Sequence, residues 1–392
     1  MGYWFTCILM AVFICSAITF HFDGRISLEF NIAVLAGDGI GPEVTGQSVA
    51  VLKALEGVFG HRFNFQEGAI GGISIDKHGT PVKDDVLEMA SSADAVLFGA
   101  VGGPKWDDPS ASMRPEQAIL ELRAHLGVFA NIRPVKVNPL LADSSVLKSS
   151  VIEDVDLVVV RELTGGVYYA LPKEQTETPQ GWSAVDTMRY SEAEINRILR
   201  VGFELARSRQ KKLTSVDKAN VLECSRLWRY LATQMAEEYP DVQIEHVLVD
   251  SCAMQLIQQP TRFDVIVAGN MFGDILTDEA SVLASSMGLL PSASLSDIPL
   301  AGRRITGLYE PIHGTAPDIA GKGVANPIGS ILSMAMMLRY SLSLTEEAAS
   351  VERAVDQVLS QGYRTADVAT GKNITNTVDM GAQVVAALGS GE

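Results

Sequence analysis

Short apolar runs typical of buried strands alternate with segments of helical period from Asn31 to the carboxyl terminus. This order predicts an α/β fold with a largely parallel or mixed sheet. The run 32–36 leads into the turn 37–42 and then into a helix that should end at Gly60, a residue suited to a helix C-cap. Further strands are expected at 95–98, 155–160, 213–216, 244–249 and 265–268.

Helix signals fall between these strands. Ser191 and Glu194 match a capping box, and Thr80 followed by Pro81 resembles a cap and a first helical residue. One helix is expected at 115–126, and three more follow a long loop at 313–327. Because no change in composition marks a linker, any domain boundary must be discontinuous in the sequence or inferred from other features.

The first thirty residues differ from the rest. The run 3–20 is mostly apolar, and no charged residue precedes Asp23. It could barely span a bilayer, yet it lacks the basic residues of a secretory or transit signal. A membrane anchor, a cleaved leader and translated sequence upstream of the true start all remain open. We favour the last and expect residues 1–30 to lie outside the fold.

Charge and cysteine content exclude several classes of protein. The net charge of −16 disfavours nucleic-acid and anionic-membrane partners. The cysteines form no CxxC pair, which argues against structural zinc and a disulfide scaffold. They are Cys7, Cys15, Cys224 and Cys252. Reduced thiols and a cytoplasmic location are therefore expected.

Three arginines are candidates for an anion site. Arg123 lies on the predicted helix 115–126, Arg133 follows ten residues later, and Arg161 comes directly after a predicted buried strand. Guanidinium groups match carboxylates bidentately, so convergence of the three would suit a dicarboxylate or tricarboxylate. Taken singly, each arginine could instead pair with a local acid. Glu116, Ile119 and Leu120 share the helix face of Arg123.

Three acids are candidates for a metal site. Asp274 and Asp278 lie four residues apart on one helical face, where two carboxylates repel unless a cation lies between them. Asp250, at the end of a predicted buried strand, could supply a third ligand for Mg²⁺ or Mn²⁺. A solvated acidic helix face is about equally compatible with the first two.

Other polar positions carry weaker signals. Lys218 follows a predicted strand and Tyr168 follows two glycines, so each could move a proton, although residues of both types are usually solvated or packed. The turn 37–42 nearly matches a dinucleotide fingerprint, but its glycine spacing favours a structural turn beside a ligand site. In the long polar loop, His313 could contact an adenine and Asp318 could accept ribose hydroxyls while repelling a phosphate.

Taken together, these stretches resemble the isocitrate/isopropylmalate family of β-decarboxylating dehydrogenases. The resemblance runs from Asn31 to the carboxyl terminus. Its ordered motifs are GDGIGPEV at 37–44, GAVGGPKWD at 99–107, RPEQAILELR at 114–123, NIRPVKV at 131–137, VRELTGGVY at 160–168, SVDKANVL at 215–222, GNMFGDILTD at 269–278 and HGTAPDIAGKGVANP at 313–327.

The resemblance implies a two-domain α/β fold with a mixed sheet, distinct from a Rossmann fold. A large cofactor-binding domain would comprise 31–128 and 281–392, and a small substrate and dimerisation domain would comprise 129–280. It implies a homodimer with shared active sites, in which Lys218 and Asp250 reach the site from the partner. NAD would be held by Ile40, Glu310, His313, Gly314, Thr315, Ala316, Pro317, Asp318, Ile319 and Asn326.

The resemblance also implies roles for the other candidates. Arg123, Arg133 and Arg161 would hold the malate carboxylates, and Glu116, Ile119 and Leu120 would form the pocket for the alkyl group. Asp250, Asp274 and Asp278 would bind the metal, with Asp250 also beside the substrate, while Tyr168 and Lys218 would be the acid/base pair.

The expected reaction is the NAD-dependent oxidative decarboxylation of 3-isopropylmalate to 4-methyl-2-oxopentanoate in leucine biosynthesis. Glu116, Ile119 and Leu120 offer nothing favourable to the extra carboxylate of isocitrate, and Asp318 resembles the branch that uses NAD rather than NADP. Activity on tartrate, D-malate or homoisocitrate, a non-catalytic regulatory subunit of the same fold and a membrane-tethered protein remain alternatives.

Overall fold

The computed structural model describes residues 19–20, 26–108, 111–300, 302–371 and 374–388. Residues 3–18 of the apolar run, with Cys7 and Cys15, lie outside the described residues. Within the described ranges, no helix is both long and apolar enough to cross a membrane.

A ten-stranded mixed sheet forms the centre of the molecule, in the order β11-β10-β12-β7-β6-β13-β14-β5-β3-β4. The strands are β3 (Glu29–Gly37), β4 (Arg62–Glu67), β5 (Ala95–Ala100), β6 (Ala130–Lys136), β7 (Asp156–Glu162), β10 (Lys212–Asp217), β11 (Gln243–Leu248), β12 (Val265–Ala268), β13 (Pro291–Leu295) and β14 (Gly307–Pro311). The predicted α/β class with a mixed sheet is confirmed.

The strand direction changes in the middle of this sheet. Strands β11, β10, β12 and β7 are mutually parallel, as are β14, β5, β3 and β4. Between these two groups, β6 pairs antiparallel with both β7 and β13, and β13 pairs antiparallel with β14. The two groups therefore run in opposite directions, and the chain passes from one to the other through β6 and β13.

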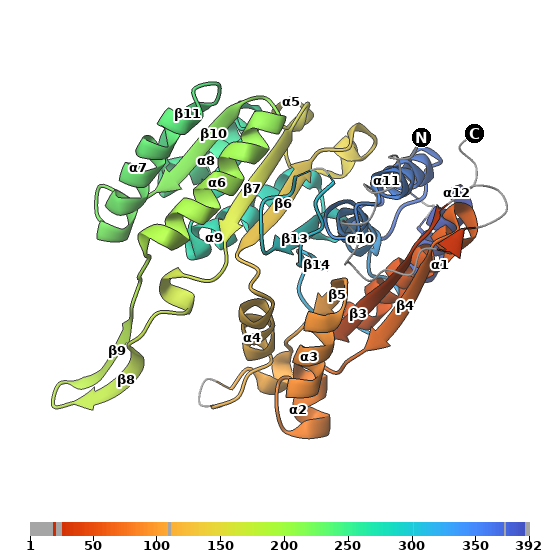
Figure 1. The fold of residues 1–392 in the computed structure, drawn as a ribbon, viewed down its shortest axis with the longest axis horizontal. Coiled ribbons are helices and arrows are strands. Elements are labelled where there is room, and N and C mark those ends of the chain that lie inside the picture. The colour runs from red at the N-terminus through yellow and green to blue at the C-terminus, as the bar shows by residue number, and fades with distance from the viewer. Residues whose placement is uncertain (1–18, 21–25, 109–110, 301, 372–373, 389–392) are drawn as a thin grey trace, which may run out of the picture.

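Helices cover both groups of strands (Figure 1). They are α1 (Gly41–Phe59), α2 (Gly72–His78), α3 (Asp84–Ser92), α4 (Glu116–Leu126), α5 (Ser149–Ile152), α6 (Glu192–Ser208), α7 (Glu223–Met235), α8 (Val249–Gln258), α9 (Asn270–Ser281), α10 (Ile328–Tyr340), α11 (Thr345–Ser360) and α12 (Thr377–Ala387). Helix α10 packs against β13, β14, α1 and α11, and nearly all its side chains are buried. Because α10 is buried on nearly all sides, it forms the centre of the core beside β13 and β14.

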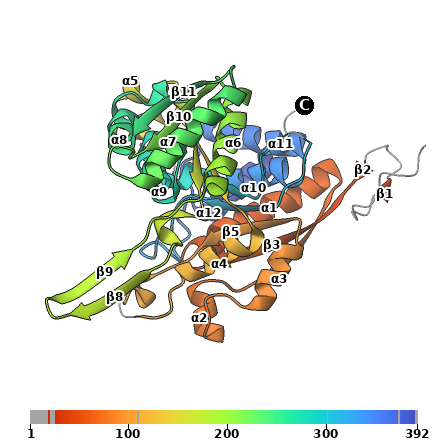
Figure 2. The same ribbon diagram turned by 60° about the vertical axis from the view of Figure 1, so that its left-hand side comes forward.

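Two small antiparallel pairs lie outside the large sheet. One joins β1 (Thr19–Phe20) to β2 (Ile26–Ser27). The other is a hairpin of β8 (Lys173–Thr178) and β9 (Gly181–Asp186), which projects away from the body of the molecule (Figures 1 and 2). The hairpin has almost entirely exposed side chains, so it contributes little to the core.

Several predicted helix ends are confirmed. Helix α1 has Pro42 in its first turn and ends at Gly60, which adopts a left-handed conformation. Ser191 and Glu194 form the predicted capping box at the start of α6, and α10, α11 and α12 are the three helices expected after Pro327.

Three expectations are corrected. Strand β3 begins at Glu29, and Phe30 is fully buried, so the fold starts before Asn31. Thr80 and Pro81 do not start a helix, because Thr80 donates to the Val82 carbonyl in a turn and α3 begins only at Asp84. Asp250 does not end a buried strand: β11 is a half-buried edge strand, and Asp250 lies in the first turn of α8.

Candidate active site

Three arginines come together where the sheet changes direction. Arg161 lies on β7, Arg133 on the neighbouring β6 and Arg123 on α4, and all three are at least nine-tenths buried. Burial and the charge of Arg133 lower the pKa of Arg161 to about 10, which still leaves it charged at neutral pH. Burial likewise lowers the pKa of Arg133, with Arg123 adding to the effect. Three buried cations at such close range favour a multiply charged anion.

Each arginine pairs with an acid that is distant in the sequence. Arg123 Nη2 lies 2.7 Å from Glu310 on β14, Arg161 Nη1 lies 2.5 Å from Asp274 on α9, and Arg133 Nη1 lies 3.8 Å from Asp278. Each arginine therefore has an acidic partner, as the alternative expects, but these acids are distant in the sequence rather than local. Glu310, expected beside the cofactor, therefore contacts a predicted substrate arginine.

Hydrogen bonds orient the arginines while leaving capacity for a ligand. Arg133 donates from Nε to Asn131 Oδ1 at 2.6 Å and from Nη1 to Thr277 Oγ1 at 2.7 Å. The buried Nε of Arg123 has no hydrogen-bond partner among the described residues. An unpartnered buried donor is costly, so this N–H is suited to donate to a ligand oxygen.

Asp274 and Asp278 lie one turn apart on α9, as the spacing predicts. Burial and the charge of Asp274 raise the pKa of Asp278, although Arg133 opposes the shift. The Tyr168 hydroxyl donates to Asp274 Oδ2 at 2.9 Å, which places Tyr168 in the same cluster. Burial and Asp274 raise the pKa of Tyr168, so its phenol stays protonated at neutral pH.

Lys218 and Asp250 form a separate pair. The Lys218 ammonium donates to an Asp250 oxygen, and this bond lowers the pKa of that carboxyl. In the part of the chain that the structure describes, no group of three His, Cys, Asp or Glu side chains is placed to hold a metal ion. Asp274 and Asp278 on α9 are carboxylates, the hard oxygen donors that Mg²⁺ and Mn²⁺ prefer, and a cation beside them would need further oxygen ligands.

The predicted pocket face of α4 lies half open beside this cluster. Glu116 is exposed, while Ile119 and Leu120 are half-buried, and the opposite face is packed into the core through Ala118 and Leu122. A helix with one packed face and one half-exposed apolar face beside buried arginines can receive an alkyl group.

A cleft of about 350 Å³ lies between the predicted glycine turn and the long polar loop. Its lining includes Asp38, Gly102, Trp106, Thr315 and Pro317. The backbone N–H of Ile40 donates to the Thr315 carbonyl at 2.9 Å, joining the two segments. Gly39 has φ +57°, and a Cβ there would lie 2.1 Å from the Thr315 carbonyl oxygen, so glycine is required for this approach.

The polar loop is held from several sides. Glu43 on α1 accepts hydrogen bonds from the backbone N–H groups of Gly321 and Gly323. Asn326 is buried and donates to Asp367 at 3.1 Å. Burial lowers the pKa of His313, and its buried Nε2 has no hydrogen-bond partner among the described residues. Asp318 is exposed. Between His313 and Asn326 lie the other loop residues expected to bind the cofactor, Gly314, Thr315, Ala316, Pro317 and Ile319. An unpartnered imidazole nitrogen on the loop that supplies Thr315 and Pro317 to the cleft could hydrogen-bond a ring nitrogen or a hydroxyl of a nucleotide.

Four residues near these sites were not predicted as contributors. Asp38 is buried at the end of β3 and accepts N–H bonds from Gly72, Ile73 and Gly102, which shapes the cleft. Asn131, Thr277 and Asn270 orient the arginines. All four lie inside the quoted motifs. A polar residue after a strand was an available signal for Asp38 and Asn270, whereas Thr277 lies within α9 and carries no such signal.

Comparisons with known proteins agree with this arrangement. The family model "Isocitrate/isopropylmalate dehydrogenase" matches residues 31–384. The 3-isopropylmalate dehydrogenase of Dehalococcoides mccartyi strain 195 is 56% identical over 92% of this chain and 100% of its own. The enzyme of that name from Bacillus subtilis is 52% identical over 92% of this chain and 98% of its own.

Solved structures give the same result. Isocitrate dehydrogenase from Methylococcus capsulatus matches with a TM-score of 0.79 at 32% identity, over 92% of this chain and 99% of that one. A β-decarboxylating dehydrogenase from Thermococcus kodakarensis matches with a TM-score of 0.71 at 34% identity, over 92% of this chain and 96% of that one. The chain belongs to the isocitrate/isopropylmalate dehydrogenase family.

Proposed function

We propose that this chain catalyses the NAD-dependent oxidative decarboxylation of 3-isopropylmalate in leucine biosynthesis. The observation that carries the proposal is the cluster of three buried arginines facing Asp274 and Asp278, beside a half-exposed apolar helix face. Relatives more than half identical over nine-tenths of the chain bear the name 3-isopropylmalate dehydrogenase, which supports the substrate.

The substrate's two carboxylates fit the arginines, and its alkyl group fits α4. Arg123, Arg133 and Arg161 supply planar donors from three elements, so a bound dicarboxylate is fixed in orientation as well as attracted. Ile119 and Leu120 offer apolar contact to the isopropyl group. Glu116 would repel a third carboxylate, which disfavours isocitrate.

Asp274 and Asp278 would hold the divalent cation together with Asp250 of the partner subunit. A bound Mg²⁺ or Mn²⁺ supplies Lewis-acid polarisation of the substrate oxygen, and bound NAD⁺ supplies the hydride acceptor. The chain's own residues orient the substrate and move protons. Lys218 of the partner subunit would take the hydroxyl proton as a neutral amine, and NAD⁺ bound beside C2 would accept the hydride. The bond to the β-carboxylate then breaks, CO₂ leaves, and Tyr168 donates its phenol proton to the remaining carbanion.

We assign the cleft between the glycine turn and the polar loop to NAD. His313 would contact the adenine through its unpartnered nitrogen. Asn326, on the same loop, is positioned by Asp367, which lies between α11 and α12. Exposed Asp318 would accept the ribose hydroxyls and repel the 2′-phosphate of NADP.

We further propose a homodimer with shared sites. Lys218 and Asp250 are paired with each other, and no hydrogen bond or ion pair among the described residues joins them to the arginine cluster. Met254 on α8 and Ile275 on α9 are more than half exposed, which is unusual for apolar side chains on adjacent helices and fits a face that a partner subunit covers.

The described cysteines, Cys224 and Cys252, are unpaired, in keeping with action in the cytoplasm.

The test is NADH formation by the purified protein with 3-isopropylmalate, isocitrate, tartrate and malate in turn, each with and without a chelator. The proposal predicts the highest kcat/KM with 3-isopropylmalate and loss of turnover on chelation. A higher kcat/KM with another acid would reassign the substrate, and no turnover with any would favour a non-catalytic role.

A further inference from the structure

Asn270 links two parts of the proposed active site that are distant in the sequence. It is the first residue of α9 and is 1% exposed. Its Oδ1 accepts from Arg161 Nη2 at 2.8 Å and from Nε at 3.2 Å, and its carbonyl accepts from the same Nε at 3.0 Å. On its other side, Nδ2 donates to the Gly165 carbonyl at 3.2 Å. One amide therefore joins the Arg161 guanidinium to the turn that precedes Tyr168.

The bonds to Arg161 fix one edge of the guanidinium. Arginine has five N–H groups in a rigid plane. Asn270 occupies the Nε and Nη2 edge, and Asp274 accepts from Nη1. One N–H of each terminal nitrogen then remains for a substrate carboxylate. Gly273 permits this arrangement, because a Cβ there would lie 2.7 Å from Arg161 Cγ.

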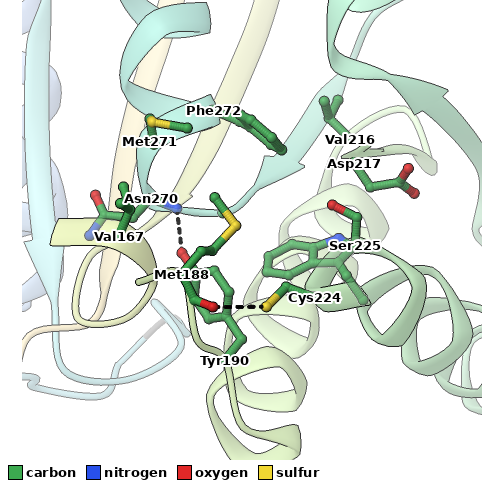
Figure 3. Close-up of a pocket in the computed structure, with 12 residues that line it drawn as sticks. Val167, Met188, Tyr190, Val216, Asp217, Cys224, Ser225, Asn270, Met271 and Phe272 are labelled. Atoms are coloured by element: carbon green, nitrogen blue, oxygen red, sulfur yellow. Dashed lines mark hydrogen bonds between the residues drawn. The ribbon is translucent and has the colours of Figure 1, made fainter. Parts of the chain in front are cut away.

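Tyr190 fixes Asn270 in turn. Its hydroxyl accepts the backbone N–H of Asn270 at 2.7 Å, which satisfies one of the unpaired donors at the start of α9 (Figure 3). The same ring lies against the glycine turn, since a Cβ on Gly165 or Gly166 would lie 2.5 Å from an atom of Tyr190. A small cavity of about 20 Å³ borders Tyr190 and Asn270, while Asn270 itself is buried.

We propose that Asn270 is a positioning residue. It holds the Arg161 guanidinium and the Gly165–Gly166 turn, which precedes Tyr168 in the sequence, in one fixed arrangement. This inference rests on the proposed function, because it assigns the two ends of the link to substrate binding and to proton donation. The two ends of its side-chain amide have different roles. Oδ1 accepts from Arg161 and so affects substrate binding, whereas Nδ2 donates to Gly165 and so affects the position of Tyr168 during turnover.

Two variants test the two roles. Asn270→Asp keeps an oxygen for Arg161 but replaces the donor to Gly165, so kcat should fall about tenfold or more while KM for 3-isopropylmalate stays within about threefold. Asn270→Ala removes both contacts, so KM should rise about tenfold or more in addition to the fall in kcat. Calorimetric Kd values for the substrate should follow KM in both variants.

The control is Thr214→Val, which removes a buried side-chain hydrogen bond to Glu245 in the same half of the sheet. It should lower the melting temperature without changing kcat or KM. If both Asn270 variants change kcat and KM by one common factor, or only as far as their melting temperatures fall, the positioning role is overturned. If the wild type does not turn over 3-isopropylmalate, the proposed function fails and this inference fails with it.

Discussion

The hydroxyl of Tyr168 donates to Oδ2 of Asp274 at 2.9 Å, while Oδ1 of the same carboxylate accepts from Arg161 at 2.5 Å. Asp274 thus contacts both Arg161, a proposed substrate-binding residue, and Tyr168, the proposed proton donor. Because burial and the Asp274 charge raise the pKa of Tyr168, the phenol retains its proton throughout the neutral range. This geometry suits proton donation to a carbanion rather than proton removal.

Tyr168→Phe should therefore lower kcat by about 10²-fold or more with little change in KM for 3-isopropylmalate. The matched control is Tyr169→Phe, since the neighbouring hydroxyl has no hydrogen-bond partner among the described residues. Steady-state NADH formation compares the two. Equal kcat values for both variants would show that Tyr168 is not the proton donor.

Arg123→Ala should abolish measurable turnover at ordinary substrate concentrations. The change removes one guanidinium group that is proposed to bind a substrate carboxylate. It also leaves Glu310 buried without its ion-pair partner, so kcat/KM should fall by at least about 10²-fold. Arg200→Ala, which breaks an exposed pair with Glu238, is the control and should be near normal. Near-normal kinetics for Arg123→Ala would contradict the carboxylate clamp.

Asp278 should make the metal-free protein less stable as the pH rises. Its pKa is raised above 3.8 in the folded state, so the folded protein binds this proton more readily than the unfolded chain does. The free energy of unfolding attributable to this group therefore falls as pH rises from 3.8 through the raised pKa, and the cost persists at neutral pH.

Asp278→Asn should then raise the free energy of unfolding at pH 7 without metal, by less than about 1 kcal/mol because the carboxyl is more than half exposed. Added Mg²⁺ should stabilise the wild type more than the variant. Urea unfolding at pH 5 and pH 7 measures both effects, with Glu237→Gln at an exposed position as control. A destabilised metal-free variant would contradict the direction of the pKa shift.

Asp318→Ala should relax coenzyme choice. The exposed carboxylate would no longer repel a 2′-phosphate, so kcat/KM for NADP should rise relative to NAD by about tenfold. Initial rates with each coenzyme give the ratio. Exposed Glu346→Gln, in the first turn of α11, should leave it unchanged. If the ratio of kcat/KM for NADP to that for NAD is unchanged in Asp318→Ala, Asp318 does not contact the adenine ribose.

Local signals predicted much of the fold because they depend on neighbouring residues. The capping box at Ser191, the left-handed Gly60 and the apolar strand Val265–Ala268 are each encoded within a few positions. Strands β6, β13 and β14 were not predicted as strands, since their residues are buried by pairing with distant segments. The hairpin β8–β9 was also missed, because its exposed polar strands carry no apolar pattern.

The candidate site was predictable as a set of residue types but not as a geometry. Arg161 could be marked from its place at a buried strand, yet its contacts with Asn270 and Asp274 depend on α9 packing across Gly273. Asp250 was assigned to a strand end because the boundary between β11 and α8 has no cap signal. Pairings over more than a hundred positions are set by tertiary packing.

The central claim is that each active site combines the Tyr168 cluster of one chain with Lys218 and Asp250 of another. Tyr168→Phe and Lys218→Ala, each nearly inactive alone, should regain activity when unfolded together and refolded as a mixture. Half the dimers would then be mixed, each with one intact site of two, so activity should recover to about a quarter of the wild type. Recovery to about that level supports the shared site, whereas a mixture no more active than the separate variants would contradict it.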